Sequence, residues 1–121
     1  MYLDHTNPDS ITHNTKRVLA TLKGLRACLA DAAVRYIRAS PQYCDALSVS
    51  TESDDGDLDV RLVANSDSEL WFATGDVQYD TVHGTACEAV TISATDTDAE
   101  LEERAKELVQ GVADQLAEQG A

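Results

Sequence analysis

The sequence predicts a small α+β domain in which an antiparallel sheet lies between one helix near each end of the chain. Apolar residues recur at three- and four-residue steps near both ends, and they alternate with polar residues in between. Turn signals rich in Gly and Asp separate the alternating runs. We therefore expect a two-layer sandwich with both helices on one face of a four- or five-stranded meander, in the order α-β-β-β(-β)-α.

The chain length predicts a single domain. It has 121 residues, enough to bury a core without a metal or disulfides. Residues 1–7 form a polar lead-in, and the domain extends over residues 8–119. No internal repeat and no linker divides this range, so a second domain is not expected.

The first helix is predicted from Pro8 to about Ala39. Asn7 before Pro8 is a helix-start signal, because a capping side chain precedes a proline in the first turn. Ser40-Pro41 is the stop signal, since proline disfavours the helical conformation in the residue before it. A helix of this length exceeds the usual size, so a break at Thr12–Thr15 or at Gly24 is also considered.

Strands are predicted in the middle of the chain, in five runs rich in β-branched, aromatic or alternating apolar residues: Ala46–Glu52, Leu58–Ala64, Leu70–Thr74, Val77–Val82 and Ala86–Ala94. Asp55-Gly56 is a hairpin signal between the first two runs, because both residues tolerate positive φ. Residues 70–82 form either one bent strand or two short ones.

The last helix is predicted from a capping box. Thr97 and Glu100 have the spacing at which each side chain bonds the other's backbone N–H. Acidic residues crowd the first turns, where the helix dipole favours them. An apolar stripe follows, and Gly120 lies where the helix would end.

The charge is strongly acidic and unevenly distributed. Twenty-two carboxylates face nine basic side chains, for a formal net charge of −13. Residues 1–44 have six basic and three acidic groups, and residues 45–121 have three basic and nineteen acidic ones. Such a surface repels itself unless salt screens it. We expect a cytoplasmic protein of a salt-accumulating halophile, with diffuse solvent cations at the acidic surface.

No motif for catalysis, cofactor binding or metal binding stands out. The three cysteines (Cys28, Cys44 and Cys87) cannot all pair within one chain, which agrees with free thiols in a reducing cytoplasm. His83 and Cys87 are weak metal candidates, but a zinc site needs three or four converging ligands. No signal peptide and no run long enough to cross a bilayer is present.

A cationic face is predicted on the first helix. Four basic residues surround Lys16, opposite the apolar stripe: Arg17, Lys23, Arg35 and Arg38. The favoured interpretation is a solvated face whose cations pair with the chain's own carboxylates, and the alternative is contact with phosphate or an acidic protein. The element order resembles that of double-stranded-RNA-binding domains, but acids stand where that resemblance requires cations in the second helix. Nucleic-acid binding is not expected at high salt.

Trp71-Phe72 is a candidate interaction surface. On a strand the two side chains point to opposite faces, so one enters the helix-covered core and the other lies on the open face. An aromatic side chain there suggests a protein partner, because aromatic residues are enriched at interfaces. The alternative is an isolated exposed ring.

The function predicted from sequence is that of a small non-catalytic interaction or regulatory protein that forms a homodimer or binds another protein. The first alternative is a nucleic-acid-associated regulator using the cationic face. A weakly supported enzyme or metal protein is the second.

Overall fold

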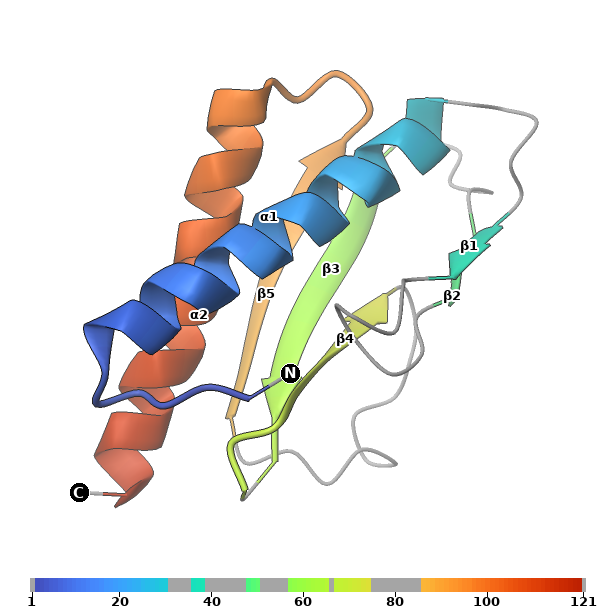
Figure 1. Cartoon of the computed structure of the whole chain (residues 1–121). Helices are drawn as coiled ribbons and strands as arrows, with labels where there is room; N and C mark the ends of the chain where they lie inside the picture. Colours follow the sequence, from blue (N-terminus) through green and yellow to red (C-terminus); the bar gives the residue numbers. More distant parts are fainter. Residues whose placement is uncertain are drawn as a thin grey trace.

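The structure is a computed structural model that describes residues 2–30, 36–38, 48–50, 57–65, 67–74 and 86–120. The elements follow in the order α1 (Pro8–Ala30), β1 (Tyr36–Arg38), β2 (Ser48–Ser50), β3 (Asp57–Ala64), β4 (Leu70–Thr74), β5 (Ala86–Ser93) and α2 (Asp98–Gly120), as Figure 1 shows. The α+β class agrees with the sequence pattern, whereas the sheet differs from the expected one.

Both helix starts follow the local signals in the sequence. Asn7 Oδ1 accepts a hydrogen bond from the Asp9 N–H at 3.0 Å, so Asn7 caps α1. At α2, Thr97 Oγ1 accepts from the Glu100 N–H at 3.2 Å, and Glu100 Oε1 accepts from the Thr97 N–H at 3.3 Å. This reciprocal pair is the predicted capping box, and it satisfies backbone donors that a helix start otherwise leaves without partners.

The predicted end of the first helix is wrong. α1 ends at Ala30 and runs through Thr12–Thr15 and Gly24 without a break. Tyr36–Arg38 forms β1 and pairs antiparallel with β2. The proline after Ser40 sets only the latest point at which a helix can end, and Tyr-Ile favours a strand once a partner is present.

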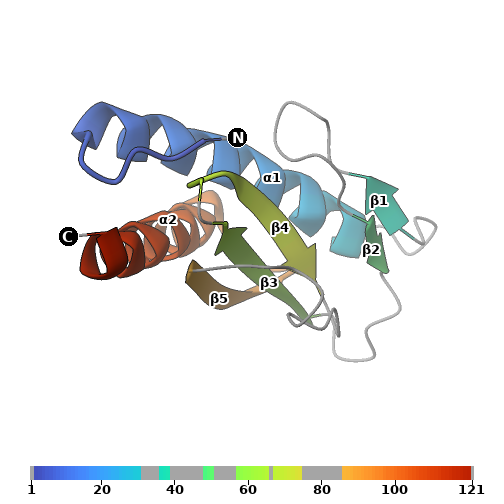
Figure 2. The ribbon, with the colours of Figure 1, turned by 90° about the horizontal axis from the view of Figure 1, so that it is seen from below.

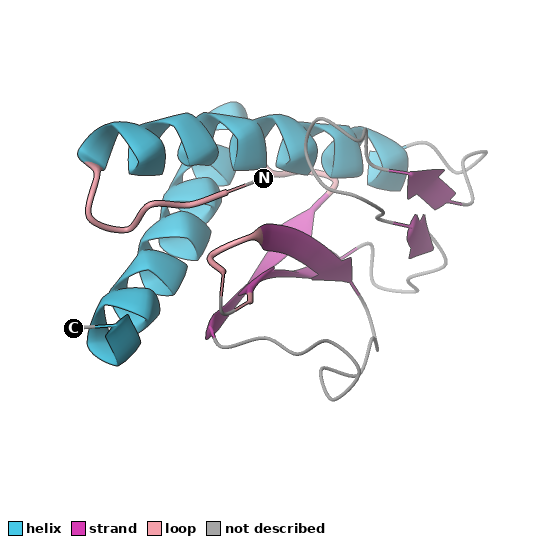
Figure 3. Cartoon of the chain, turned by 60° about the horizontal axis from the view of Figure 1, so that its bottom comes forward, coloured by secondary structure: helices cyan, strands magenta, loops and turns pink. Residues whose placement is uncertain are grey.

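The predicted four- or five-stranded meander is also wrong. The described strands form a separate β1–β2 pair and a three-stranded sheet in the order β4-β3-β5; Figure 3 shows the two apart. The run Ala46–Glu52 was expected to pair with β3, but β4 and β5 occupy both edges of β3. A strand has only two edges, so β2 pairs with β1 instead. The expected turn at Asp55-Gly56 and strand at Val77–Val82 lie outside the described residues.

The core lies between the helices and one face of the three-stranded sheet. Both helices are on the same side of this sheet (Figure 2). Alternate residues of β3 face them, and Leu58, Val60 and Leu62 are at most 6% exposed. The apolar stripe of α2 packs against the same core, from Leu101 to Leu116. This is the arrangement that period-two strands and amphipathic helices favour.

The first residues of the chain belong to this core. Leu3 has no exposed surface, and its N–H donates to the Ser68 carbonyl oxygen at 2.9 Å. Tyr2 forms an isolated antiparallel bridge with Glu69. The stretch predicted as a polar lead-in therefore includes a short arm, Tyr2–Asp4, that lies beside the start of β4.

Candidate interaction surfaces

The cationic face does not form as expected. Because α1 ends at Ala30, Arg38 lies on β1 instead of the helix, and Arg35 is outside the described residues. Lys16 is exposed and Arg17 is half-buried on α1. The helix therefore brings together only part of the predicted set.

The cations at the end of α1 bind the start of α2. Arg26 Nη2 lies 2.7 Å from Asp98 Oδ1, and Lys23 Nζ lies 3.9 Å from Asp98 Oδ2. Arg26 Nη1 also donates to the Asp96 carbonyl oxygen at 3.0 Å. The hydrogen bond from Arg26, with the charges of Lys23 and Arg26, lowers the pKa of Asp98 below its ordinary value of 3.8. These cations join the two helices, a role that the sequence reasoning did not assign to Arg26.

An open groove of about 380 Å³ lies between the helices. Its polar lining comes from Thr12, Thr15 and Lys16 of α1 and from Glu102, Lys106 and Gln110 of α2. Lys106 Nζ is 3.7 Å from Glu102 Oε1 and 3.8 Å from Glu103 Oε1. The lysine of α2 thus pairs with carboxylates of its own helix, and charges of both signs line the groove.

Of the two adjacent aromatic residues, Phe72 points to the helix-covered face of the sheet, as the strand alternation predicts for one of them. This side chain is 4% exposed and belongs to the core between the sheet and the helices. It is therefore unavailable as a contact surface. Trp71 occupies the register position opposite Val63 of β3. Its side chain lies outside the described part of the structure.

The weak metal candidates are not brought together within the described residues. His83 lies outside them, and Cys87 is half-buried on β5. Among the described side chains, no three His, Cys, Asp or Glu converge on a point where a metal ion could be held. Burial raises the pKa of the Cys87 thiol, against the opposing effect of Arg61. A raised thiol pKa disfavours the thiolate that nucleophilic chemistry requires.

The second face of the three-stranded sheet is partly polar. Asp59 and Thr91 are exposed there, and Thr91 Oγ1 donates to Asp59 Oδ1 at 2.8 Å. Val63, on the same face by strand alternation, is only 1% exposed and does not belong to the helix-facing core. This face is thus hydrated at the Asp59 end and covered at the Val63 end.

The outer edge of β5 is covered by side chains of α2. The Gln115 amide accepts from the Cys87 N–H at 3.0 Å and donates to the Cys87 carbonyl oxygen at 2.7 Å. It thereby occupies the two backbone groups that another strand would use. Arg104 Nε donates to the Thr91 carbonyl oxygen at 3.4 Å on the same edge. Nothing in the apolar spacing of α2 had indicated this role for Gln115.

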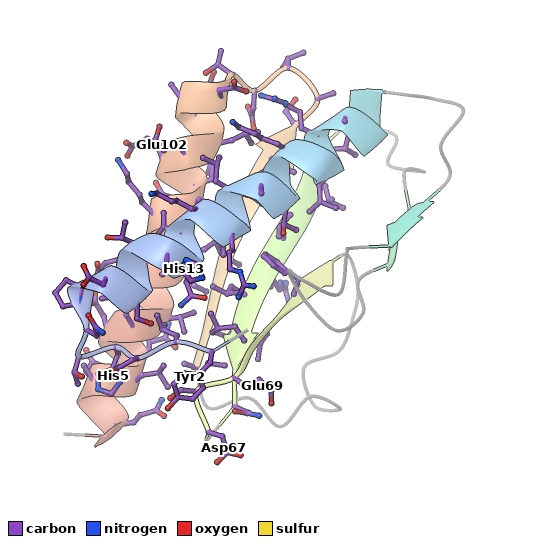
Figure 4. The ribbon with its side chains drawn as sticks, viewed as in Figure 1. Tyr2, His5, His13, Asp67, Glu69 and Glu102 are labelled. Carbon is purple, nitrogen blue, oxygen red and sulfur yellow. The ribbon has the colours of Figure 1, made fainter. Side chains whose placement is uncertain are left out.

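Within the described residues, the outer edge next to β4 is covered only just before the strand begins. The arm lies against the turn before β4, and Figure 4 shows Tyr2 and Glu69 next to each other there. Asn14 of α1 holds the arm, since its Nδ2 donates to the Tyr2 carbonyl oxygen at 2.9 Å. No described backbone group bonds the outer edge of β4 beyond this point.

The described helices lack the length of apolar sequence needed to cross a membrane. The chain matches no protein-family model, and neither the curated proteins nor the solved structures gave a match.

Proposed function

We propose that this chain is a small non-catalytic interaction protein, working in the cytoplasm of a salt-accumulating halophile, that associates with a second copy of itself. The observation that carries this proposal is that, among the described residues, side chains of α2 cover the outer edge of β5 and none covers that of β4. Gln115 and Arg104 bond the β5 edge, whereas the described arm reaches only the residues just before β4, and β4 itself has no ionisable side chain.

Isolated proteins usually protect their edge strands with charge, bulges or a covering segment. The β5 edge follows this rule through α2. β4 consists of Leu-Trp-Phe-Ala-Thr, an uncharged and aromatic strand in a chain whose net charge is −13. Among the described strands, β4 thus has an outer edge without charged side chains, and this supports an association role.

The acidic composition supports the high-salt setting. The chain has fourteen Asp and eight Glu but only three Lys and six Arg. Two such chains repel each other in dilute buffer and less so when the screening length falls to about 3 Å at 1 M salt. Association should therefore strengthen as salt rises. Lys23 and Arg26 pair with Asp98 of the same chain, and this pairing does not favour the alternative in which the cations bind nucleic acid.

The molar mass of the protein in solution tests whether it self-associates. Light scattering after gel filtration, in about 2 M KCl, should give twice the 13.0 kDa of the single chain. The dimer fraction should fall as KCl is lowered, at matched protein concentration. A 13.0 kDa species at high micromolar concentration in molar KCl would contradict the proposal.

A further inference from the structure

The hydrogen bonds of the β3–β4 turn determine which backbone groups of β4 face outward. The Asn65 N–H donates to the Glu69 carbonyl oxygen at 3.1 Å, so Asn65 and Glu69 form a bonded pair. Bonded and non-bonded pairs alternate along an antiparallel ladder. Trp71 and Ala73 therefore direct their backbone groups toward β3, opposite Val63 and Arg61. Those of Leu70, Phe72 and Thr74 point away from it.

The outer edge of β5 obeys the same alternation. Cys87 stands opposite Val63, which bonds toward β4, so the backbone groups of Cys87 face outward. These are the groups that Gln115 bonds. The alternation assigned to β4 therefore agrees with the side-chain hydrogen bonds on the other side of the sheet.

The arm limits which part of the β4 edge another strand can reach. The bridge between Tyr2 and Glu69 and the bond from Leu3 to Ser68 place the arm beside the two residues immediately before β4. Leu3 is fully buried, so the arm is anchored there by core packing. Phe72 and Thr74 are the outward-facing positions of β4 beyond the arm.

We infer that two copies join through this edge, their β4 strands antiparallel, with the two-fold axis at Ala73; the inference rests on the self-association proposed above. Phe72 of each copy then exchanges backbone hydrogen bonds with Thr74 of the other, and Ala73 faces Ala73 of the second copy as a non-bonded pair. The two three-stranded sheets become one sheet of six strands.

The arm selects this register over its neighbour. A two-fold axis at Phe72 would pair Thr74 of the second copy with Leu70, the residue next to the Tyr2–Glu69 bridge of the first copy. An axis at Ala73 uses only Phe72 and Thr74 as bonded positions, and neither adjoins this bridge. The pairing also sets no like charges opposite each other within Leu70–Thr74, because this strand has no ionisable residue. The described β1–β2 pair bonds internally and not to β4.

A cysteine at the axis tests the inference. The Cα atoms of a non-bonded antiparallel pair lie about 4.5 Å apart, within the roughly 4.4–6.8 Å that a disulfide spans. Ala73→Cys, in a chain whose Cys28, Cys44 and Cys87 are changed to Ser, should shift to twice 13.0 kDa on a non-reducing gel after mild oxidation by glutathione disulfide in molar KCl. Reductant should reverse the shift.

Ala89→Cys is the matched control. Ala73 and Ala89 both stand opposite Arg61, one on each side of β3, and Ala89 is exposed on the edge that α2 covers. This variant should remain monomeric on the same gel. Equal cross-linking of the two variants would indicate random collision and would overturn the inference. A scattering mass of 26 kDa without cross-linking of Ala73→Cys would leave self-association standing and remove the β4 pairing.

Hydrogen exchange on the unaltered chain gives a measurement that no substitution can disturb. The amide protons of Phe72 and Thr74 should gain protection in molar KCl as protein concentration rises through the dimerisation range. The Cys87 amide, already bonded by Gln115, should not change. Protection of Phe72 and Thr74 that is independent of concentration would mean that the chain's own residues cover this edge, and it would overturn the inference.

Discussion

At the residue scale, two glycines inside helices differ in what surrounds them. A Cβ built on Gly24 of α1 meets nothing within 4 Å. A Cβ on Gly111 of α2 would collide with the Glu88 side chain, whose Cγ and Cδ would lie 2.8 Å away and whose Oε2 would lie closer still. Gly111 therefore lets the Glu88 side chain of β5 pass over α2, whereas Gly24 has no such neighbour.

This contrast predicts opposite outcomes for the same substitution. Glycine in a helix interior costs about 0.5–1 kcal/mol relative to alanine. Gly24→Ala should therefore raise the free energy of unfolding by about that amount. Gly111→Ala should give no gain or a loss, because the Glu88 side chain must move. Urea unfolding in molar KCl measures both.

The control for Gly111 is the removal of its neighbour. In a Glu88→Ala background, Gly111→Ala should recover the stabilisation expected from helix propensity. If Gly111→Ala stabilises the unaltered chain as much as Gly24→Ala does, then Glu88 does not restrict this position.

At the scale of elements, the start of α2 combines a local and a distant contribution. Thr97 and Glu100 form the capping box within four residues of sequence. Arg26 reaches Asp98 from the other helix and also bonds the carbonyl oxygen of Asp96. The acidic first turn of α2 therefore stabilises this helix by interacting favourably with its dipole, and it also binds α1.

The link between the helices predicts a pH-dependent contribution to stability. The pKa of Asp98 is lowered in the folded chain, so the unfolded chain binds its proton more readily. The stabilisation is present above the ordinary pKa of 3.8 and is lost as pH falls through the lowered value. Arg26→Gln should return the Asp98 pKa toward 3.8, as measured by NMR titration of the carboxyl carbon.

Two further substitutions calibrate this titration. Lys23→Gln should move the Asp98 pKa by less, since its ammonium lies 3.9 Å from the carboxylate and the guanidinium of Arg26 lies 2.7 Å from it. Lys106→Gln should leave it unchanged, because Lys106 pairs with Glu102 and Glu103. An Asp98 pKa that Arg26→Gln does not alter would show that the helices do not rely on this pair.

At the scale of the whole molecule, net charge is the dominant feature. Residues 45–121 hold nineteen acidic and three basic groups, and the core that they enclose is built largely from α2 and the three-stranded sheet. Like charges oppose the compact state more strongly when screening is weak. The free energy of unfolding should therefore depend on salt.

Circular dichroism in about 0.1 M and about 2 M KCl tests this expectation. The folded signal and the unfolding midpoint should both increase at the higher concentration. Sucrose solutions at low ionic strength provide the control, because they favour compact states without screening charge. Equal stability at both KCl concentrations would argue against a protein adapted to molar salt.

The sequence by itself determined two kinds of property: local features that depend on a few neighbouring residues, and the overall charge of the chain. Asn7 and the pair Thr97 and Glu100 marked both helix starts, because a cap bonds backbone groups within a few residues. The alternation over Leu58–Ala64 marked the central strand, since period two is a property of the strand alone. The acid excess follows from composition.

Only the tertiary structure decided which strands pair and which side chains guard their edges. β2 pairs with β1, whereas β4 and β5 are the neighbours of β3. Tyr36–Arg38 became a strand because that partner was available. Gln115 meets Cys87 across 28 residues of chain, and Arg26 meets Asp96 across 70. A backbone edge accepts any strand or amide that reaches it, so its partner is set by how the elements pack and not by its own residues.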